Sequence, residues 1–283
     1  MATWSVGSTC VVEGITVTPC TGLNANFNNL TYNCPSQTIA QPIGGSATYT
    51  GNFLIQNTNT GSLVVSSTAS ATISVNGDFT ISGGTLDLNS STTTFNGSLY
   101  LFKNFAMTGG TITKTGTGSG STNIRWYALS TPITQQYSKT GGTFSGAILF
   151  REMANVILDM GSSIIDGSSG SFSFESATIL ATLITGNSGG IASSGATGSI
   201  QVGGTRTFST GANYIYNGSG AQVTGTGLPA TINNLTIDNS AGVKLSNTAL
   251  TVNGIMLINS GKLFTLESGK QLKVAGTLTN NAG

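Results

Sequence analysis

The sequence predicts an all-β protein, a parallel β-solenoid made of short tandem coils, where a coil is one circuit of the chain around the long axis. Three observations predict it: very little charge, an alternation of apolar and polar residues, and short phrases that recur. Only 7% of the 283 residues are charged, and 40 are glycine. An average soluble protein has about 25% charged residues. Disorder is not expected, because hydrophobic residues make up 38% and the net charge is only +1.

The strands are predicted by the alternation. In "ATISVNGDFTISGGTLDL" (residues 71–88), apolar residues occupy every second position on both sides of Asn76-Gly77. Such alternation, broken by Asn-Gly or Gly-Gly, is typical of short β-strands joined by turns. Asn and Gly are expected at the corners because they adopt left-handed backbone conformations. The best helix candidate, "REMANVILDM" (Arg151–Met160), is interpreted as another strand centred on Val156-Ile157-Leu158.

The solenoid is favoured over a sandwich or barrel by internal repeats. The phrase Ser/Thr-Gly-Gly-Thr-apolar begins at residues 82, 108 and 140, and "VNGDFTISGGTLDL" (Val75–Leu88) resembles "VNGIMLINSGKLFTL" (Val252–Leu266). Stacked coils produce near-copies of this kind because each coil presents the same inward face to its neighbours. About 11 or 12 coils would fit, at one coil per repeat of this length.

The repeats also suggest how the chain is divided. Residues 1–45 are expected to form an irregular, cysteine-containing N-terminal cap, and residues 46–283 the solenoid. The stretch "NIRWYALSTPITQQY" (123–137) is longer and less repetitive than its neighbours, and predicts an insertion thrown out from one coil. Loops on a rigid scaffold often carry function.

All three cysteines, Cys10, Cys20 and Cys34, lie in the expected cap. Two of them could form a disulfide in an oxidising compartment, which would leave one thiol over. The alternative is three small buried apolar side chains, and the sequence leaves both open. A zinc site would need a fourth ligand, and the chain has no histidine. We therefore predict no metal and no cofactor.

Several partner classes are not expected. The ten Lys and Arg residues are scattered, whereas nucleic-acid binding needs a basic cluster. No apolar stretch reaches 18 residues, so no membrane span is predicted. The start "MATWSVGSTC" has no signal-peptide pattern, and we expect that a secretion signal has been removed.

The stretch Gly190–Gly254 includes "GTRTFSTGANYIYNG" (Gly204–Gly218) and "GLPATINNLTIDNSAGV" (Gly227–Val243), followed by "LTVNG". With these phrases the chain resembles a repeat of very large secreted surface proteins of Bacteroidetes-type bacteria, over about residues 65–283. The resemblance implies a right-handed parallel β-helix that is exported and displayed on the bacterial cell surface, with an adhesive or structural role. It carries over no catalytic residue, because the shared positions belong to turns and core.

An enzyme is not predicted. Glycoside hydrolysis usually needs two facing carboxylates. The best candidates are Glu152, Asp159, Asp166 and Glu175 beside Arg151, but their spacing matches no known motif and no histidine assists them. A solvated face or a ladder with Arg151 is the simpler interpretation.

Two function classes remain to be considered, ligand binding and assembly with other chains. Trp126, Tyr127 and Tyr137 could form a stacking platform for glycans, or their rings could pack in the core. Open ends of a solenoid template further strands, so the chain could stack end to end with itself or with other surface proteins. The sequence therefore predicts an extracellular structural or adhesive protein that assembles into a filament or stalk, and leaves a carbohydrate-binding or polysaccharide-cleaving β-helix as the alternative.

Overall fold

The computed structural model describes residues 4–174 and 181–281, and it is all-β, with no helix among these residues. Parallel strands stack as a β-solenoid of about 11 turns, which confirms the predicted fold class. The handedness stays a prediction. The chain divides into two compact units, which we describe separately: unit 1 (Met1–Trp126, Ser138–Arg151 and Gly167–Ser171) and unit 2 (Tyr127–Tyr137, Glu152–Asp166 and Phe172–Gly283).

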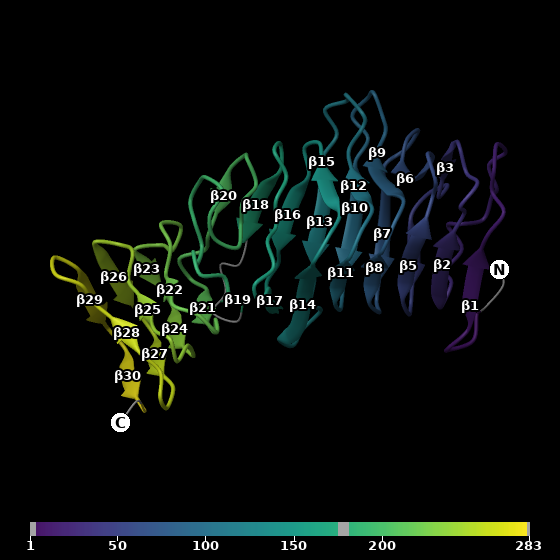
Figure 1. The fold of residues 1–283 in the computed structure, drawn as a ribbon. Helices are drawn as coiled ribbons and strands as arrows, with labels where there is room; N and C mark the ends of the chain where they lie inside the picture. The colour runs from purple at the N-terminus through teal and green to yellow at the C-terminus, as the bar shows by residue number, and fades with distance from the viewer. Residues whose placement is uncertain (1–3, 175–180, 282–283) are drawn as a thin grey trace. The chain divides into compact units, whose positions relative to one another are not determined.

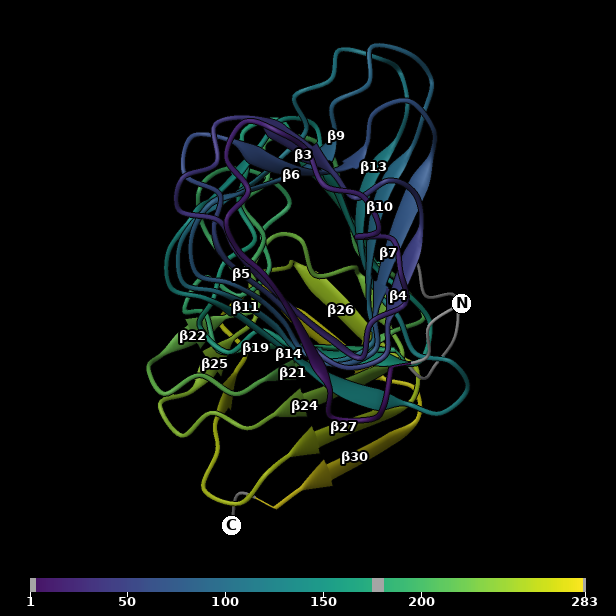
Figure 2. The same cartoon turned by 90° about the vertical axis from the view of Figure 1, so that its right-hand side faces the viewer.

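Each coil of unit 1 passes through three faces, and each face is a parallel sheet (Figures 1 and 2). The β1 face contains β1 (Thr9–Val12), β2 (Asn29–Asn33), β5 (Phe53–Asn57), β8 (Phe79–Ile81) and β11 (Phe105–Met107). The β3 face contains β3 (Ala40–Pro42), β6 (Ser62–Ser66), β9 (Thr85–Asn89), β12 (Thr111–Thr113) and β15 (Thr143–Ser145). The β4 face contains β4 (Ala47–Tyr49), β7 (Ala71–Val75), β10 (Gly97–Leu101), β13 (Thr122–Trp126) and β16 (Leu149–Glu152).

The recurring phrases occupy equivalent places in successive coils, as predicted. Thr111 of the second Gly-Gly-Thr phrase is in register with Thr85 of the first and with Thr143 of the third. On the β1 face, Phe79 is in register with Phe105. Equivalent residues of successive repeats are therefore paired in register across the sheets.

The glycine of the Asn-Gly phrase is not required for a left-handed backbone conformation, contrary to what was expected. Gly77 and Gly254 are not in the left-handed region, whereas Gly84 of the following Gly-Gly pair has φ of 74°. A Cβ on Gly77 would lie 2.4 Å from the backbone carbon of Gly51, and one on Gly254 would lie 2.2 Å from Asn234 Oδ1. The Asn-Gly glycine is thus required by the close approach of the preceding coil.

The core of unit 1 is a column of aromatic rings. The inward-facing Phe53, Phe79 and Phe105 are at most 1% exposed. The ring of Phe79 lies 5.5 Å from that of Phe53 and 5.6 Å from that of Phe105, measured between centroids. Contacts of this kind add about 0.5–1.5 kcal/mol per pair beyond simple burial. The outward positions between them, such as Thr80, are half-buried.

Unit 2 continues the same alternation with shorter strands. One sheet contains β14 (Ile133–Lys139, mostly in unit 2), β17 (Val156–Asp159), β19 (Thr182–Thr185), β21 (Asn213–Tyr216), β24 (Asn234–Ile237), β27 (Ile255–Ile258) and β30 (Thr277–Asn280). Two three-stranded sheets contain β22 (Gln222–Val223), β25 (Val243–Lys244) and β28 (Phe264–Thr265), and β23 (Thr231–Ile232), β26 (Ala249–Val252) and β29 (Gln271–Val274). β18 (Ser171–Phe174) pairs with β20 (Arg206–Thr207). The strand interpretation of Val156–Leu158 is confirmed by β17.

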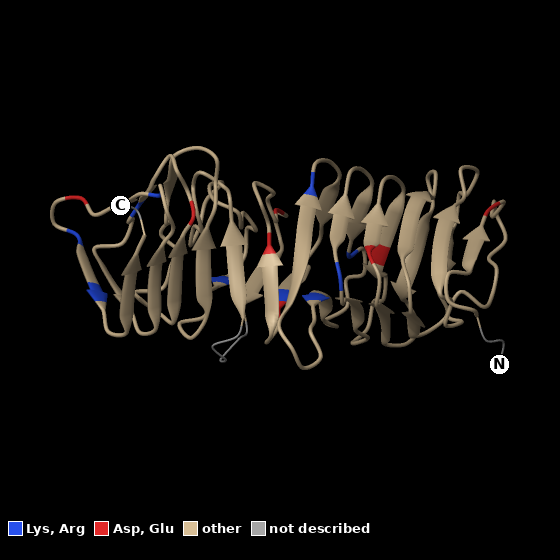
Figure 3. Cartoon of the chain, turned by 90° about the horizontal axis from the view of Figure 1, so that it is seen from below, with Lys and Arg blue, Asp and Glu red and all other residues tan. Residues whose placement is uncertain are grey.

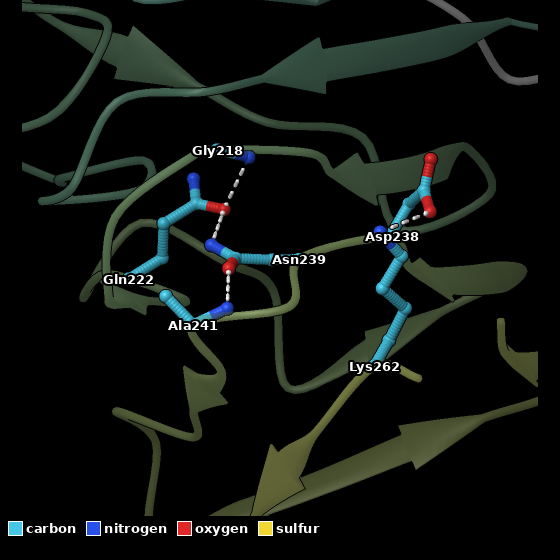
Figure 4. Close-up of polar contacts among 6 residues, drawn as sticks. All are labelled: Gly218, Gln222, Asp238, Asn239, Ala241 and Lys262. Carbon is cyan, nitrogen blue, oxygen red and sulfur yellow. Dashed lines mark hydrogen bonds and ion pairs between the residues drawn. The ribbon is translucent and has the colours of Figure 1, made fainter. Parts of the chain in front are cut away.

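Buried amides join the coils of unit 2 (Figure 4). Gln222 and Asn239 are at most 2% exposed. Asn239 Nδ2 donates to Gln222 Oε1 at 2.7 Å, and the same oxygen accepts the backbone N–H of Gly218 at 2.8 Å. Asn239 Oδ1 accepts the N–H of Ala241 at 2.7 Å. Neutral amides therefore satisfy backbone N–H groups at this corner.

The expected cap at residues 1–45 is not confirmed. β1 pairs in parallel with β2, with Cys10 in register with Leu30, and β3 pairs with β6. The segment therefore contributes three strands to the same sheets as the coils that follow.

Candidate functional site

The three rings expected to form a glycan platform lie mostly in the core. Trp126, at the end of β13 in unit 1, is 0% exposed, and its ring lies 6.4 Å from that of Phe105 between centroids. Tyr137 in unit 2 is 2% exposed, and its hydroxyl donates to the carbonyl of Ile164 at 2.9 Å. Tyr127 alone is half-buried. A sugar has no access to the ring faces of Trp126 and Tyr137, and their burial matches the core interpretation that the sequence left open.

The segment 123–137 is mostly strand. It contains the end of β13 and the beginning of β14, so the connection between the two strands is limited to residues 127–132. Gln135 Nε2 donates to the carbonyl of Tyr127 at 2.8 Å and closes this connection. Leu129 at its tip is 83% exposed.

Of the acids considered for catalysis, Glu152 lies in the core and Asp159 is engaged in local hydrogen bonds. Glu152 is 0% exposed, and burial raises its pKa well above the usual range. Asp159 instead accepts hydrogen bonds from Gln136 Nε2 at 3.1 Å and from the N–H of Gly161 at 3.0 Å. Glu175 lies outside the described residues. Figure 3 shows how few charged positions the chain has and how widely they are spread.

The three cysteines are free thiols in this structure, so the disulfide that the sequence left open as one of two alternatives is not formed in it. Cys34 is buried, and its Sγ lies 3.5 Å from the carbonyl oxygen of Val12. Cys10 and Cys20 are half-buried, and desolvation raises the pKa of both thiols. Within the described residues, no group of three or more Cys, Asp or Glu side chains is placed to hold a metal ion.

The clearest exposed apolar surface lies on the last coil of unit 2, formed by β28, β29 and β30. Each of these strands is at the edge of its sheet. Met256 is in register with Leu278, but Met256 is 1% exposed and Leu278 is 55% exposed. Likewise Val252 is 0% exposed, whereas Val274, its partner in register, is only half-buried. The inward positions that are covered at Val252 and Met256 are therefore open at Val274 and Leu278.

Leu263 and Leu266 add to this surface, with exposures of 55% and 44%. We call the edge of β28–β30 that faces away from β25, β26 and β27, together with these side chains, the lysine edge. The name refers to Lys262, Lys270 and Lys273, which belong to the same coil. Lys262 lies 3.5 Å from Asp238 in an ion pair that Figure 4 shows.

Unit 1 has a comparable edge at β1. Cys10 and Val12 of β1 are half-buried, although their partners in register, Leu30 and Tyr32, are at most 1% exposed. Val11 is 54% exposed. We call this side of β1 the β1 edge; Glu13 is the one charged residue in the first 40 positions of the sequence.

The sequence reasoning missed three polar residues on the outer side of the β4 face: Tyr100, Asn123 and Arg125. They line a hollow in unit 1. The signal was present, since Asn123 and Arg125 alternate with the inward Ile124 and Trp126 in "NIRW". Trp126 has the inward parity of β13, so its position could not indicate the outward surface.

Comparison with protein-family models, with curated proteins and with solved structures finds no match for this chain. The resemblance to secreted bacterial surface repeats therefore stays a prediction. The described residues contain no helix with the length and apolarity to cross a membrane.

Proposed function

We propose that this chain is an extracellular structural and adhesive surface protein of bacterial origin that assembles edge to edge into a filament or stalk. The observation that carries the proposal is the uncovered inward face of the lysine edge, above all Leu278. The contact proposed is between the lysine edge of one copy and the β1 edge of the next.

Burial is the first argument for this contact. Apolar surface in contact with water costs about 25 cal/mol per Å², and an unpaired strand edge presents a row of free N–H and C=O groups. Another parallel coil would cover both at once, with the same register that joins Met256 to Leu278. The β1 edge supplies such a coil, since its inward Val12 is only half-buried.

Charge and symmetry support the same pairing. The coil of the lysine edge carries Lys262, Lys270 and Lys273 against Glu267, whereas Glu13 gives the β1 edge a negative charge. Two lysine edges would repel each other. A contact between two different edges is heterologous, and heterologous contacts that do not close into a ring produce filaments.

The experiment is negative-stain electron microscopy combined with sedimentation velocity over a concentration series of the purified chain. Assemblies that lengthen with concentration are expected, and they should shorten as salt is raised because opposite charges contribute. A single sedimenting species at the mass of one chain, at every concentration, would overturn the proposal.

A further inference from the structure

The outer side of the β4 face in unit 1 carries a hollow of about 310 Å³, near the lower limit of ordinary ligand pockets. It lies over β7, β10 and β13, whose outward residues align in two columns. Thr72, Ser98 and Asn123 form one column, and Tyr100 and Arg125 stand side by side in the other. Apart from Ala71, every lining residue has a polar side chain, and none is a carboxylate.

The turns that lead into these strands are locked from coil to coil. Ser70 Oγ accepts the backbone N–H of Asn96 at 2.9 Å, and Asn96 Oδ1 accepts the N–H of Ser121 at 2.7 Å. The rim of the hollow is thus held by the fold, and ligand binding need not order it.

Asn123 points to a missing partner. Its side chain is 3% exposed and lines the hollow, yet its Oδ1 has no hydrogen-bond partner among the described residues. Its Nδ2 makes one long contact, 3.5 Å to Ser98 Oγ. A buried acceptor left unpaired costs about 1–3 kcal/mol, so a hydroxyl donor placed in the hollow would be bound there.

Arg125 defines the charge of that ligand. Its guanidinium lies over the ring of Tyr100, with Cζ 5.3 Å from the ring centroid, and this contact holds the planar fork in one orientation. Within the part of the chain that the structure describes, its buried Nε has no hydrogen-bond partner, and none of the residues that line the hollow is an acid. A single fixed guanidinium suits one carboxylate, which it can bind through two parallel hydrogen bonds.

We propose that this hollow is a binding site for an acidic saccharide, with the carboxylate of a uronic acid on Arg125 and the sugar hydroxyls on Asn123 and Ser98. Hydroxyl and amide side chains both donate and accept, as sugar hydroxyls do. A polyphosphate or nucleic acid is a poor fit, because one cation cannot replace the counterions of a dense polyanion. The site is independent of the edges that carry the proposed assembly.

The test is isothermal titration calorimetry of the full chain with tri-galacturonic acid and with its methyl ester, which keeps the sugar and removes the charge. We expect the acid to bind at least about tenfold more tightly than the ester, the value of a charge-assisted hydrogen bond. Arg125→Gln should abolish the difference, and the exposed Lys103→Gln in the same unit should preserve it.

Equal binding of acid and ester, no binding of either, or an equal loss in Lys103→Gln would overturn the proposal. The comparison of acid with ester uses the unaltered chain, so it decides the matter even if Arg125→Gln does not fold. Arg125→Lys keeps the charge but loses the planar fork, and should bind the acid with intermediate affinity.

Discussion

The ring of Phe105 lies on the ring of Phe79, one coil away on the β1 face, with centroids 5.6 Å apart and planes inclined by 26°. The two residues are also partners in register. The aromatic ring of one coil thus packs on the ring at the equivalent position of the next coil. This explains how a chain with so few charges holds its coils together.

Phe79→Ala is expected to lower the free energy of unfolding by about 3–5 kcal/mol, because it removes a fully buried ring from the middle of the aromatic column. Urea denaturation followed by circular dichroism measures the change. Thr80→Ala, at the neighbouring outward position, should change it by no more than about 0.5 kcal/mol. Equal effects of the two substitutions would contradict the alternating assignment of β8.

Gly118→Ala should destabilise unit 1 by about 1–3 kcal/mol through a clash of backbones. A Cβ at Gly118 would lie 1.8 Å from the carbonyl oxygen of Thr93, because the β12–β13 connection lies against the β9–β10 connection. Gly220→Ala is the matched control, since nothing lies within 4 Å of its Cβ position and its φ is not in the left-handed region. Thermal unfolding of both variants measures the difference, and a neutral Gly118→Ala would show that the two connections are not packed as described.

How much the sequence predicted depends on the length scale. Alternation predicted the strands around Phe79, and the recurring Gly-Gly-Thr phrases predicted their register, because both patterns follow directly from pleated strands in stacked coils. The burial of Trp126 followed the same parity rule as Ile124 but was obscured by its residue type. The packing of the 90–95 and 115–120 connections could not be predicted, because it depends on the path of two irregular segments in space.

The residues of the candidate site also divide into features that the sequence pattern predicts and features that only the structure reveals. Asn123 and Arg125 lie at outward positions that the alternation indicates, but only the structure places Arg125 over Tyr100. The buried Glu152 shares its parity with Phe150, and a pattern of residue types gives no reason to expect a carboxyl group at a core position.

Glu152 should make the protein less stable as pH rises. Burial raises its pKa well above the usual 4.5 and outweighs the opposing effect of the backbone N–H of Leu158, and neither carboxyl oxygen makes a hydrogen bond of normal geometry among the described residues. The folded state therefore keeps the proton that the unfolded chain releases above about pH 4.5. The stability contributed by the neutral carboxyl is fully present below that pH and is lost as pH rises toward the raised pKa.

Denaturant unfolding of the parent chain and of Glu152→Gln between pH 4 and pH 8 measures this effect. The parent should lose stability with increasing pH relative to the variant, and the two curves should converge at the acidic limit. Tyr214, the other titratable group affected by Glu152, has its own pKa raised far above this range by burial and stays neutral throughout. Parallel curves would show that Glu152 is not buried in the folded state.

Thiol labelling should distinguish Cys34 from the other two cysteines. Cys34 is buried, and we expect it to react with a disulfide reagent only when the chain unfolds. Cys10 and Cys20 are half-buried with raised thiol pKa values, so their slow reaction in the native state should accelerate as pH increases. Mass spectrometry of the labelled native protein should find two modifications, whereas three rapid modifications would contradict the burial of Cys34, the residue that follows β2.

Leu278→Lys is expected to abolish assembly of the chain without unfolding it. Leu278 is 55% exposed and faces inward on an edge strand, so a lysine there meets solvent in the isolated chain but would be buried, with its charge, in the proposed contact. Sedimentation velocity of the variant should show a single species at concentrations where the parent forms assemblies. The matched control is Leu129→Lys, which replaces an 83% exposed leucine that belongs to neither edge and should assemble like the parent. If both variants assemble, a different surface joins the copies; if neither does, charge in general, and not the lysine edge, controls the association.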